Sequence, residues 1–350
     1  MSTTVRTLLL ITASSPEIQR VRRPRVLNFQ QITMPYLAAF APPHWKVIHI
    51  DEVVSPVDFG MLVDLVAITF HTPSAPHAYA MADQFRQRGT PVVLGGPHVT
   101  LMPDEAQGHA DVIFVGEAES HWPQFLREFE AGHHRQRYCS TEPPSLEGTP
   151  MARKDLFHRR DHTAGVLFAT RGCPHYCDFC TVAVMYQSRV RKRRVEAVAE
   201  EYGSFPGKVI ILWDDNIASD ETLDFLEAAG VQNATFNILT PFPGTRLYQR
   251  LEAEGRILTR NWSKYNGRAD VVFRPRLMSP EQLLAGYEYA NKRFYSWRSV
   301  CKRLARSPVG LSWTLPLNLA YMFAPSINSI AGGVRLAPAQ SRASGFRGLP

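Results

Sequence analysis

Short apolar segments alternate with longer helix-like stretches through the first third of the chain, and this alternation limits the fold more than any other feature of the sequence. The apolar segments have the length and the β-branched content of strands that are buried on both faces. Because enough residues for a helix separate successive segments, the pattern predicts an α/β domain with a doubly wound parallel sheet. The five expected strands are residues 5–11, 46–50, 65–70, 91–94 and 111–115.

Polar or glycine-rich residues stand where the last three of these strands end. Ligands of open parallel sheets bind outside the carboxyl ends of the strands, so we expect a cofactor-binding rim there. The glycines have a simpler alternative role, because tight turns after strands need such residues in any case. The expected rim consists of Thr69, Gly95, Gly96, Gly116 and Glu117.

Composition restricts the class of protein further. A chain of 350 residues with 45% hydrophobic content can bury two ordinary cores, which favours two domains. The formal charge of +7 is modest for this length and suits anionic cofactors as well as any nucleic acid. We expect no nucleic-acid partner, and we interpret the basic run 189–194 as a solvated face that precedes a helix.

Three of the five cysteines, Cys173, Cys177 and Cys180, lie within eight residues on a loop after an apolar strand. This is the wrong pattern for a secreted disulfide scaffold, and it favours a metal site in a reducing cytoplasm. Three thiolates at this spacing can hold one small iron–sulfur cluster and leave one iron open to a ligand. Two alternatives are a zinc site completed by His175, and free buried thiols.

The region around the cysteine loop contains three further apolar segments, at residues 165–170, 208–213 and 234–239. The second of them ends in Asp214, Asp215 and Asn216, which could bind the polar groups of a ligand beside the loop. The alternative role for the two aspartates is to cap a helix N-terminus.

The loop from Cys173 to Cys180, with Phe179 before the last cysteine, resembles the signature of radical S-adenosylmethionine (SAM) enzymes. The preceding domain, with residues 94–100, 103–106 and 115–119, resembles the cobalamin-binding subfamily of these enzymes. Residues 237–245 and 278–282 are similar to the C-terminal portion of the subfamily. Together these similarities extend over most of residues 5–300.

The resemblance implies a [4Fe–4S] cluster on the three cysteines, SAM chelated to its open iron, and cobalamin in the first domain. It also implies that Phe179 lies against the adenine of SAM and that Asp214, Asp215 and Asn216 bind its polar groups. The implied activity is radical methyl transfer or oxidative carbon-centre chemistry on a hydrophobic metabolite. An electron donor such as flavodoxin or ferredoxin would be needed.

The sequence departs from the family in two respects. It lacks the Asp-x-His-x-x-Gly motif, so cobalamin is expected to bind without a histidine on its lower face. The barrel is also short, because six β/α units need on the order of 180 residues, whereas residues 161–275 leave room for fewer. A second hypothesis is therefore a remnant or partner subunit that binds cluster or corrinoid without turnover, and a third is a zinc-stabilised interaction module.

The expected domain organisation is 1–131 for the cobalamin-binding-like domain, 132–160 for a linker, 161–275 for a truncated radical SAM barrel and 276–350 for a helical segment and tail. The uncharged stretch 307–334 is interrupted by prolines and glycines, which favours a helix packed on protein or on a membrane surface over a membrane span. We expect a cytoplasmic protein with possible peripheral membrane contact. Open strands of a partial barrel also favour a homodimer.

Overall fold

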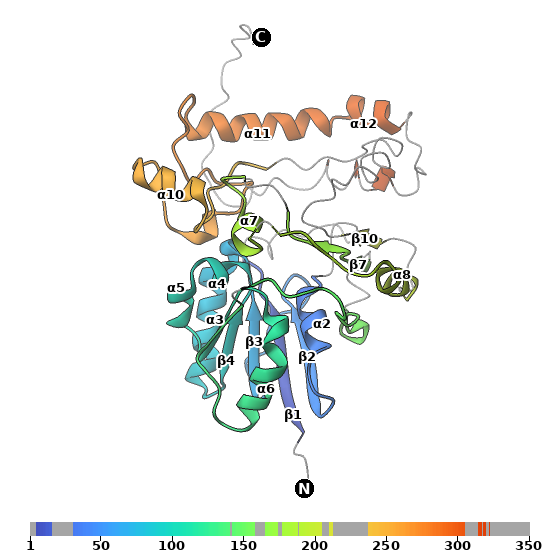
Figure 1. Ribbon diagram of the computed structural model, residues 1–350. Coiled ribbons are helices and arrows are strands. Elements are labelled where there is room, and N and C mark those ends of the chain that lie inside the picture. Colours follow the sequence, from blue (N-terminus) through green and yellow to red (C-terminus); the bar gives the residue numbers. More distant parts are fainter. Residues whose placement is uncertain are drawn as a thin grey trace, which may run out of the picture.

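The computed structural model describes residues 5–15, 31–140, 142–157, 165–173, 177–187, 189–204, 210–212, 237–304, 314–316, 318–319 and 322. Its main feature is a parallel sheet in the first domain, with strand order β2-β1-β3-β4-β5-β6 (Figure 1). This is the doubly wound α/β fold that the sequence predicts. The strands are β1 (Arg6–Thr12), β2 (Trp45–Asp51), β3 (Leu65–Thr69), β4 (Val92–Gly95), β5 (Val112–Val115) and β6 (Arg137–Cys139).

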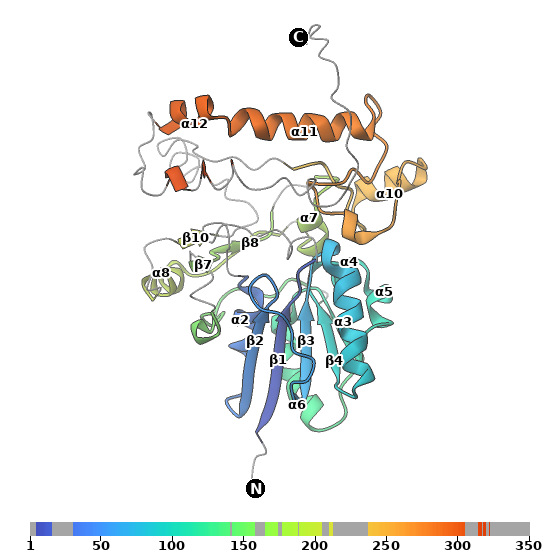
Figure 2. The same ribbon diagram turned by 180° about the vertical axis from the view of Figure 1, so that it is seen from behind.

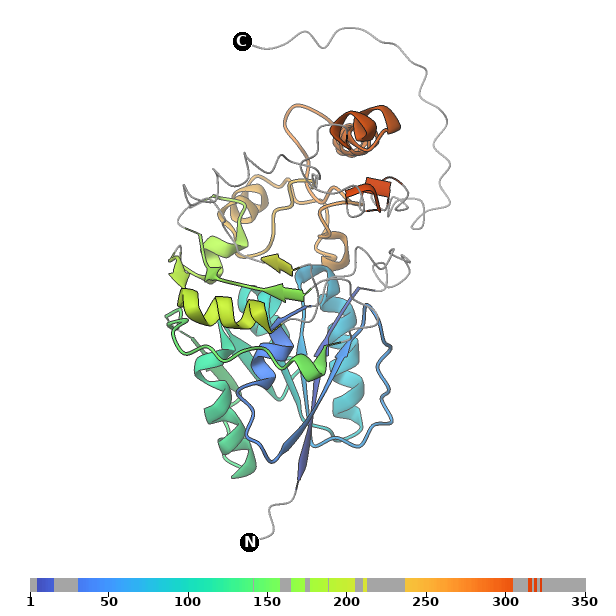
Figure 3. The same cartoon turned by 90° about the vertical axis from the view of Figure 1, so that its right-hand side faces the viewer.

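Helices cover both faces of this sheet, as Figures 2 and 3 show. Alternate side chains of each strand enter opposite cores, so Leu8 and Leu10 pack on one side and Leu9 and Ile11 on the other. One core is closed by α2 (Thr33–Ala38) and α6 (Trp122–Glu130), and the other by α3 (Ala75–Gln87), α4 (Pro97–Leu101) and α5 (Pro103–Gln107). Short 3-10 turns at Thr72–Ser74 and Ala118–Ser120 follow β3 and β5.

The sheet has six strands where the sequence predicts five. The additional strand, β6, lies in the segment expected to be a linker and pairs with the last three residues of β5. It has one inward side chain, Tyr138, which is buried between two exposed neighbours. A three-residue edge strand with a single apolar contact produces no apolar run, which is why the sequence pattern misses it.

After the linker the chain forms two small strand pairs. Strands β7 (Gly165–Leu167) and β10 (Ile210–Leu212) pair in parallel, as adjacent strands of a β/α barrel do, and β8 (Thr170–Arg171) pairs antiparallel with β9 (Arg191–Lys192). Helices α7 (Thr181–Met185) and α8 (Val195–Gly203) complete this region. Of the third expected strand, residues 234–236 lie outside the described part of the chain and residues 237–239 are not in a strand.

The segment after residue 237 packs back on the first domain. Tyr248 of α10 (Arg246–Ala253) belongs to the same core as α3, as do Trp262, Tyr265 and Val272. The indole Nε1 of Trp262 also donates to Glu105 of α5 at 3.0 Å from each carboxylate oxygen. Residues widely separated in sequence therefore share one hydrophobic core.

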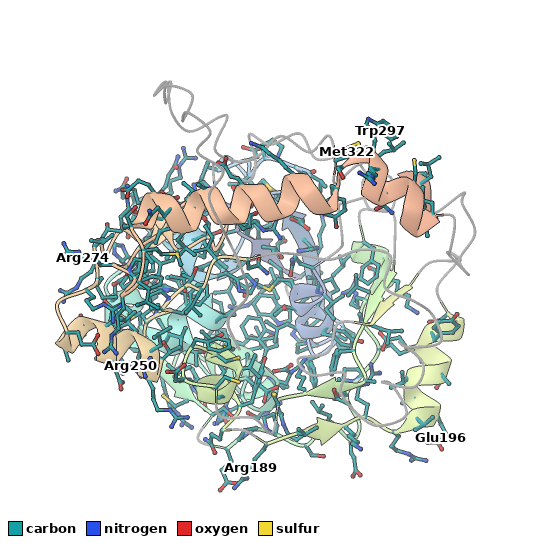
Figure 4. The ribbon with its side chains drawn as sticks, turned by 90° about the horizontal axis from the view of Figure 1, so that it is seen from above. Arg189, Glu196, Arg250, Arg274, Trp297 and Met322 are labelled. Atoms are coloured by element: carbon teal, nitrogen blue, oxygen red, sulfur yellow. The ribbon has the colours of Figure 1, made fainter. Side chains whose placement is uncertain are left out.

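The expected helical C-terminal segment contains α11 (Pro280–Phe294) and α12 (Trp297–Leu304), which lie across the end of the molecule opposite the N-terminus (Figures 1 and 4). None of the helices in the described part of the chain is both long enough and apolar enough to cross a bilayer. Most of the uncharged stretch 307–334 falls outside the described residues.

A buried ion pair joins the second region to the first domain. Arg193 donates to the Glu201 carboxylate at 2.6 Å, and both side chains are almost completely buried. Glu201 also accepts from the hydroxyl of Tyr36 on α2 at 2.6 Å and from the Ala152 backbone amide at 3.2 Å. Arg193 donates in addition to the Phe168 carbonyl at 3.0 Å. One charge pair thus links α2, the linker, the end of β7 and α8.

The interpretation of run 189–194 as a solvated face is wrong for two of its four arginines. Arg191 and Arg193 point inward to buried carboxylates, whereas Arg189 and Arg194 point outward, and Figure 4 shows Arg189 at the rim of the molecule. The reason is that β9 is extended, so successive side chains alternate between the two sides of the strand.

Removing one partner of the buried pair should destabilise the protein strongly. We expect Glu201→Ala to lower the free energy of unfolding by about 3–5 kcal/mol, because Arg193 is left as an uncompensated buried charge. The exposed pair Arg194–Glu196 offers a matched control, and Glu196→Ala should cost less than about 1 kcal/mol. Urea unfolding checks both values, and equal losses would contradict the assignment.

Candidate functional site

A cavity of about 330 Å³ lies between the sheet of the first domain and the region that carries the cysteine loop. Its floor is formed by the carboxyl ends of β1, β3, β4 and β5, including Thr12, Thr69 and Gly95. Its roof is formed by Val166 of β7, Phe168 directly after it, Arg171 of β8 and residues of both ends of α7. Figure 1 shows α7 and β7 above the ends of these strands. The cavity is therefore at the place where a doubly wound sheet binds ligands.

The structure brings all five expected rim residues to this one cavity: Thr69, Gly95, Gly96, Gly116 and Glu117. They come from the ends of three different strands, so their convergence follows from the parallel topology rather than from local sequence. The sequence did not single out the roof. The lining also contains residues of α2 and the histidine after β3, which stand outside any motif.

The backbone requires a glycine at only one of the two neighbouring glycine positions at the end of β4. Gly96 has φ 99° and ψ −174°, a conformation that is essentially restricted to glycine, and an added Cβ would lie 2.5 Å from the Thr69 hydroxyl. An added Cβ at Gly95 would meet only Phe114, at an ordinary 3.8 Å. Gly96 is thus required by the backbone, whereas Gly95 leaves space in the cavity that a side chain could fill.

Two arginines hold the carboxylates that follow β5. Arg171 contacts Glu117 at 2.7 Å and Glu119 at 2.5 Å, and Arg191 contacts the other oxygen of Glu117 at 2.6 Å. Because Arg171 lies two residues before Cys173, these ion pairs fix the start of the cysteine loop against the end of β5. Both carboxylate oxygens of Glu117 are therefore paired with arginines of the protein. This differs from the expectation that Glu117 simply binds a ligand.

These ion pairs also determine the protonation states of Glu119 and Arg171. Burial by itself would raise the pKa of Glu119, but the guanidinium of Arg171 outweighs that effect and lowers the pKa below its usual range. Burial would lower the pKa of Arg171, and Glu119 and Glu117 raise it instead. Both partners are consequently charged at neutral pH.

The cysteine loop is anchored at both ends. Gly172 has φ 91°, and a Cβ there would overlap the carbonyl oxygen of Arg189, so the residue before Cys173 has to be glycine. Near the other end, Asp178 accepts from the backbone amide of Leu247 at 2.7 Å and from Arg250 of α10 at 2.8 Å. The segment at α10 thereby positions the loop from outside.

Cys173, Cys177 and Cys180 are all free thiols, and Cys177 is exposed. In the described part of the chain, no group of three or more histidine, cysteine, aspartate or glutamate side chains is gathered closely enough to hold a metal ion. Residues 174–176 of the loop, with His175, lie outside the described residues. Phe179 is 46% exposed, and so it is accessible to a ligand. Asp214, Asp215 and Asn216 also lie outside the described residues.

Comparison with known protein families identifies two segments. Residues 30–126 match the B12 binding domain, and residues 245–312 match a domain of unknown function, DUF4070. The first match includes the ends of β3, β4 and β5 that form most of the floor of the cavity, whereas β1 precedes it. The second covers α10, α11 and α12, and it begins within the segment expected to be the barrel.

Individual relatives include two enzymes of Chlorobaculum tepidum. Bacteriochlorophyllide d C-8(2)-methyltransferase is 31% identical over 224 residues, covering 57% of this chain and 50% of the relative. Bacteriochlorophyllide d C-12(1)-methyltransferase is 22% identical over 391 residues, covering 79% of this chain and 85% of the relative. The present chain thus spans half the length of the first of these relatives.

Among solved structures, the radical S-adenosylmethionine methyltransferase TsrM from Kitasatospora setae aligns with 64% of this chain and 51% of its own, at 17% identity and a TM-score of 0.46. The first domain is thus an α/β domain of which residues 30–126 match the B12 binding domain, and it is followed by a region that carries a three-cysteine loop. These matches confirm the resemblance to cobalamin-binding radical SAM proteins over the parts of the chain that they cover.

Gly96→Ala should destabilise the first domain more than the same change at another glycine with positive φ. Gly89 has φ 79° and open space around it, so Gly89→Ala should cost about 1–2 kcal/mol for backbone conformation alone. At Gly96 a backbone strain of up to about 3 kcal/mol adds to the clash with Thr69. Thermal unfolding of both variants measures the difference in stability. A similar loss of stability in the two variants would show that the Thr69 side chain moves aside without cost.

The stabilising contribution of Glu119 should disappear in acid. Its pKa is lowered on folding, so its charge stabilises the folded state above the unfolded pKa, and that stability is lost as the pH falls through the folded value. We expect wild-type protein to exceed Glu119→Gln in urea midpoint at pH 6–7 and to approach it as the pH falls to about 3. A constant difference across this range would contradict the ion-pair origin.

Proposed function

We propose that the chain is a cobalamin-dependent radical SAM methyltransferase, binding cobalamin in the cavity, a [4Fe–4S] cluster on Cys173, Cys177 and Cys180, and SAM beside the cluster. The observation that carries the proposal is the composition of the cavity. Its floor belongs to a B12 binding domain, and its roof comes from the residues on both sides of the cysteine loop. Such an arrangement would place the two cofactors on opposite sides of one cavity.

The lining fits a corrinoid. The floor is apolar with small residues, among them Ala13, Ala67 and Gly95, and two threonine hydroxyls can orient polar groups of a ligand. The backbone does not require a glycine at Gly95, and the absence of a side chain there leaves space for a ligand. Thr69, Gly95, Gly96 and Gly116 would hold the cofactor, while Glu117 would position the roof through Arg171 and Arg191.

The donor set of the cysteine loop fits an iron–sulfur cluster, because three unpaired thiols lie within eight residues and the loop ends are fixed. When bound, the cluster and SAM would supply a strong one-electron route to a carbon radical, and cobalamin would supply a methyl group. Asp214, Asp215 and Asn216 remain proposed ligands of SAM, and Phe179 is proposed to stack on its adenine. An electron donor such as flavodoxin or ferredoxin completes the scheme.

The residues of the chain itself would exclude water and hold the reacting groups in place. Val182 and Met185 of α7 and Phe168 after β7 give the roof an apolar surface, which suits a hydrophobic small-molecule substrate. The names of the two Chlorobaculum tepidum relatives support a methyl-transfer reaction on a large organic molecule. We keep the expected domain division as part of the proposal, with the first domain extended through β6 because this strand pairs with β5. The homodimer and the peripheral membrane contact are further parts of the proposal.

A second candidate function is a corrinoid- or cluster-binding partner subunit without turnover. The alignment with the C-12(1) relative favours this function. The alignment is 391 positions long but contains only 79% of this 350-residue chain. Many residues of the relative are therefore aligned to gaps in this chain. The missing portion would fall in the expected barrel. A shortened barrel would leave the radical less protected from water.

Anaerobic purification followed by reconstitution with iron, sulfide and hydroxocobalamin distinguishes these functions. For an enzyme we expect about four irons and one corrinoid per chain, and reductant-dependent cleavage of SAM to 5′-deoxyadenosine or transfer of its methyl group. Cys177→Ala should lose the cluster, and Cys301→Ala, a free cysteine on α12, should retain it.

The corrinoid part of the experiment uses the glycine that the backbone does not require. Gly95→Val should fold normally and lose bound corrinoid, because the valine side chain fills the space that is open beside Gly95. Cofactors retained without any SAM cleavage would favour the partner subunit. Zinc in place of iron, or no bound corrinoid in wild-type protein, would overturn the proposal.

A further inference from the structure

Thr100 of α4 lies behind the rim of the cavity, and the proposed function gives it no role. It follows Gly96 by four residues and is half-buried. Thr100 is not among the residues that line the cavity, whereas its hydrogen-bond partners Gly96 and Gly116 are. Any effect of Thr100 on a ligand in the cavity would therefore act through the two glycine loops.

The Thr100 hydroxyl joins the loops that contain these glycines. It donates to the Gly96 carbonyl at 3.1 Å and accepts from the Gly116 amide at 3.0 Å. The same carbonyl also accepts from the Thr100 amide at 3.1 Å. A hydroxyl can make both contacts at once because it has one hydrogen to donate and two lone pairs to accept. One side chain thus connects the loop after β4 to the loop after β5.

The pairing of the two strands stops before it reaches these loops. The ladder between β4 and β5 ends at the pair Leu94–Ile113, so Gly96 and Gly116 lie beyond the last paired residues. Both glycines have positive φ, 99° and 84°, which turns the backbone away from the strand direction. Past the end of the ladder, the Thr100 hydroxyl takes the place of a backbone hydrogen bond between the strands.

The helix that carries Thr100 is itself held in place. His98 and Val99 are fully buried, so α4 cannot turn about its axis without displacing core side chains. The C-terminal segment supports the helix from outside, because an added Cβ at Gly244 would lie only 3.2 Å from the Leu101 side chain. The hydroxyl therefore has a fixed position from which it holds the two loops.

We propose that Thr100 is a positioning residue for the corrinoid, fixing the two glycine loops of the floor without touching the ligand. The inference rests on the proposed function. Gly96 and Gly116 have no side chains, so a ligand beside them meets the backbone directly, and its fit depends on where the two loops lie. Without the hydroxyl, the Gly116 amide loses its partner and the loops are free to move apart. Corrinoid would then have to order loops that the wild-type protein holds ready, which lowers the affinity.

The test measures the affinity of the full chain for hydroxocobalamin by equilibrium dialysis. Thr100→Val keeps the shape of the side chain without the hydroxyl, and we expect it to raise the dissociation constant about tenfold. Thr100→Ser keeps the hydroxyl and should stay within about threefold of wild type. Thr149→Val is the matched control, because the Thr149 hydroxyl donates to the Leu146 carbonyl at 2.8 Å in a loop that does not line this cavity. It should leave the dissociation constant unchanged.

A second measurement follows the loops in protein without corrinoid. Hydrogen–deuterium exchange of the peptide that contains Gly116 should be faster in Thr100→Val than in wild type, because the Gly116 amide has lost its acceptor. Thr100→Ser and Thr149→Val should exchange at the wild-type rate there. Exchange that is equally slow in Thr100→Val would show that the hydroxyl does not hold the loop, and the proposal would be wrong.

The affinities separate this proposal from the proposed function. Unchanged affinity in Thr100→Val, or an equal loss in Thr100→Ser, would overturn the role of Thr100 while corrinoid binding stands. An equal loss in Thr149→Val would indicate a general effect of lower stability and would overturn it as well. If wild-type protein binds no corrinoid, the proposed function fails, and this inference fails with it. Should Thr100→Val not fold, Thr100→Ala decides the question, since it removes the hydroxyl and leaves a smaller side chain.

Discussion

The buried ion pair between Arg193 and Glu201 is the interaction on which the placement of the second region depends. Two charges without access to water are tolerated only when their partners are fixed, and here the Tyr36 hydroxyl and the Ala152 amide complete the shell of Glu201. Burial and the adjacent carboxylate both raise the pKa of Tyr36, so its hydroxyl stays a donor. Because these groups belong to separate segments, the pair specifies one arrangement of the roof over the sheet.

That arrangement determines what the cavity can be. Arg171 and Arg191 form further ion pairs beside the cavity. These pairs join the strand before Cys173, and the strand paired with it, to the carboxylates after β5. The cysteine loop is thereby tied to the loop of a B12 binding domain by charge as well as by chain connectivity. A cofactor held by the sheet and one held by the loop would then share a fixed geometry, which is what chemistry between two bound groups requires.

Much of the fold could be predicted from the sequence, because strands buried on both faces leave continuous apolar runs and parallel topology brings their ends together. Thr69, Gly95 and Gly116 were expected at one rim for that reason, and the cavity contains them. The strand β6 and the inward arginines of 189–194 could not be predicted. A single buried tyrosine has no periodicity, and a run of arginines looks the same whether its carboxylate partners are near or absent.

The packing of the C-terminal segment into the core of the first domain has a consequence for biosynthesis. Tyr248, Trp262, Tyr265 and Val272 complete a core whose other buried members lie between residues 9 and 113. During translation the N-terminal sheet would emerge long before these side chains and would expose the surface they cover. The domain that looks autonomous in sequence would therefore finish folding only after most of the chain has left the ribosome, and its contacts of high sequence separation predict slow closure of that core.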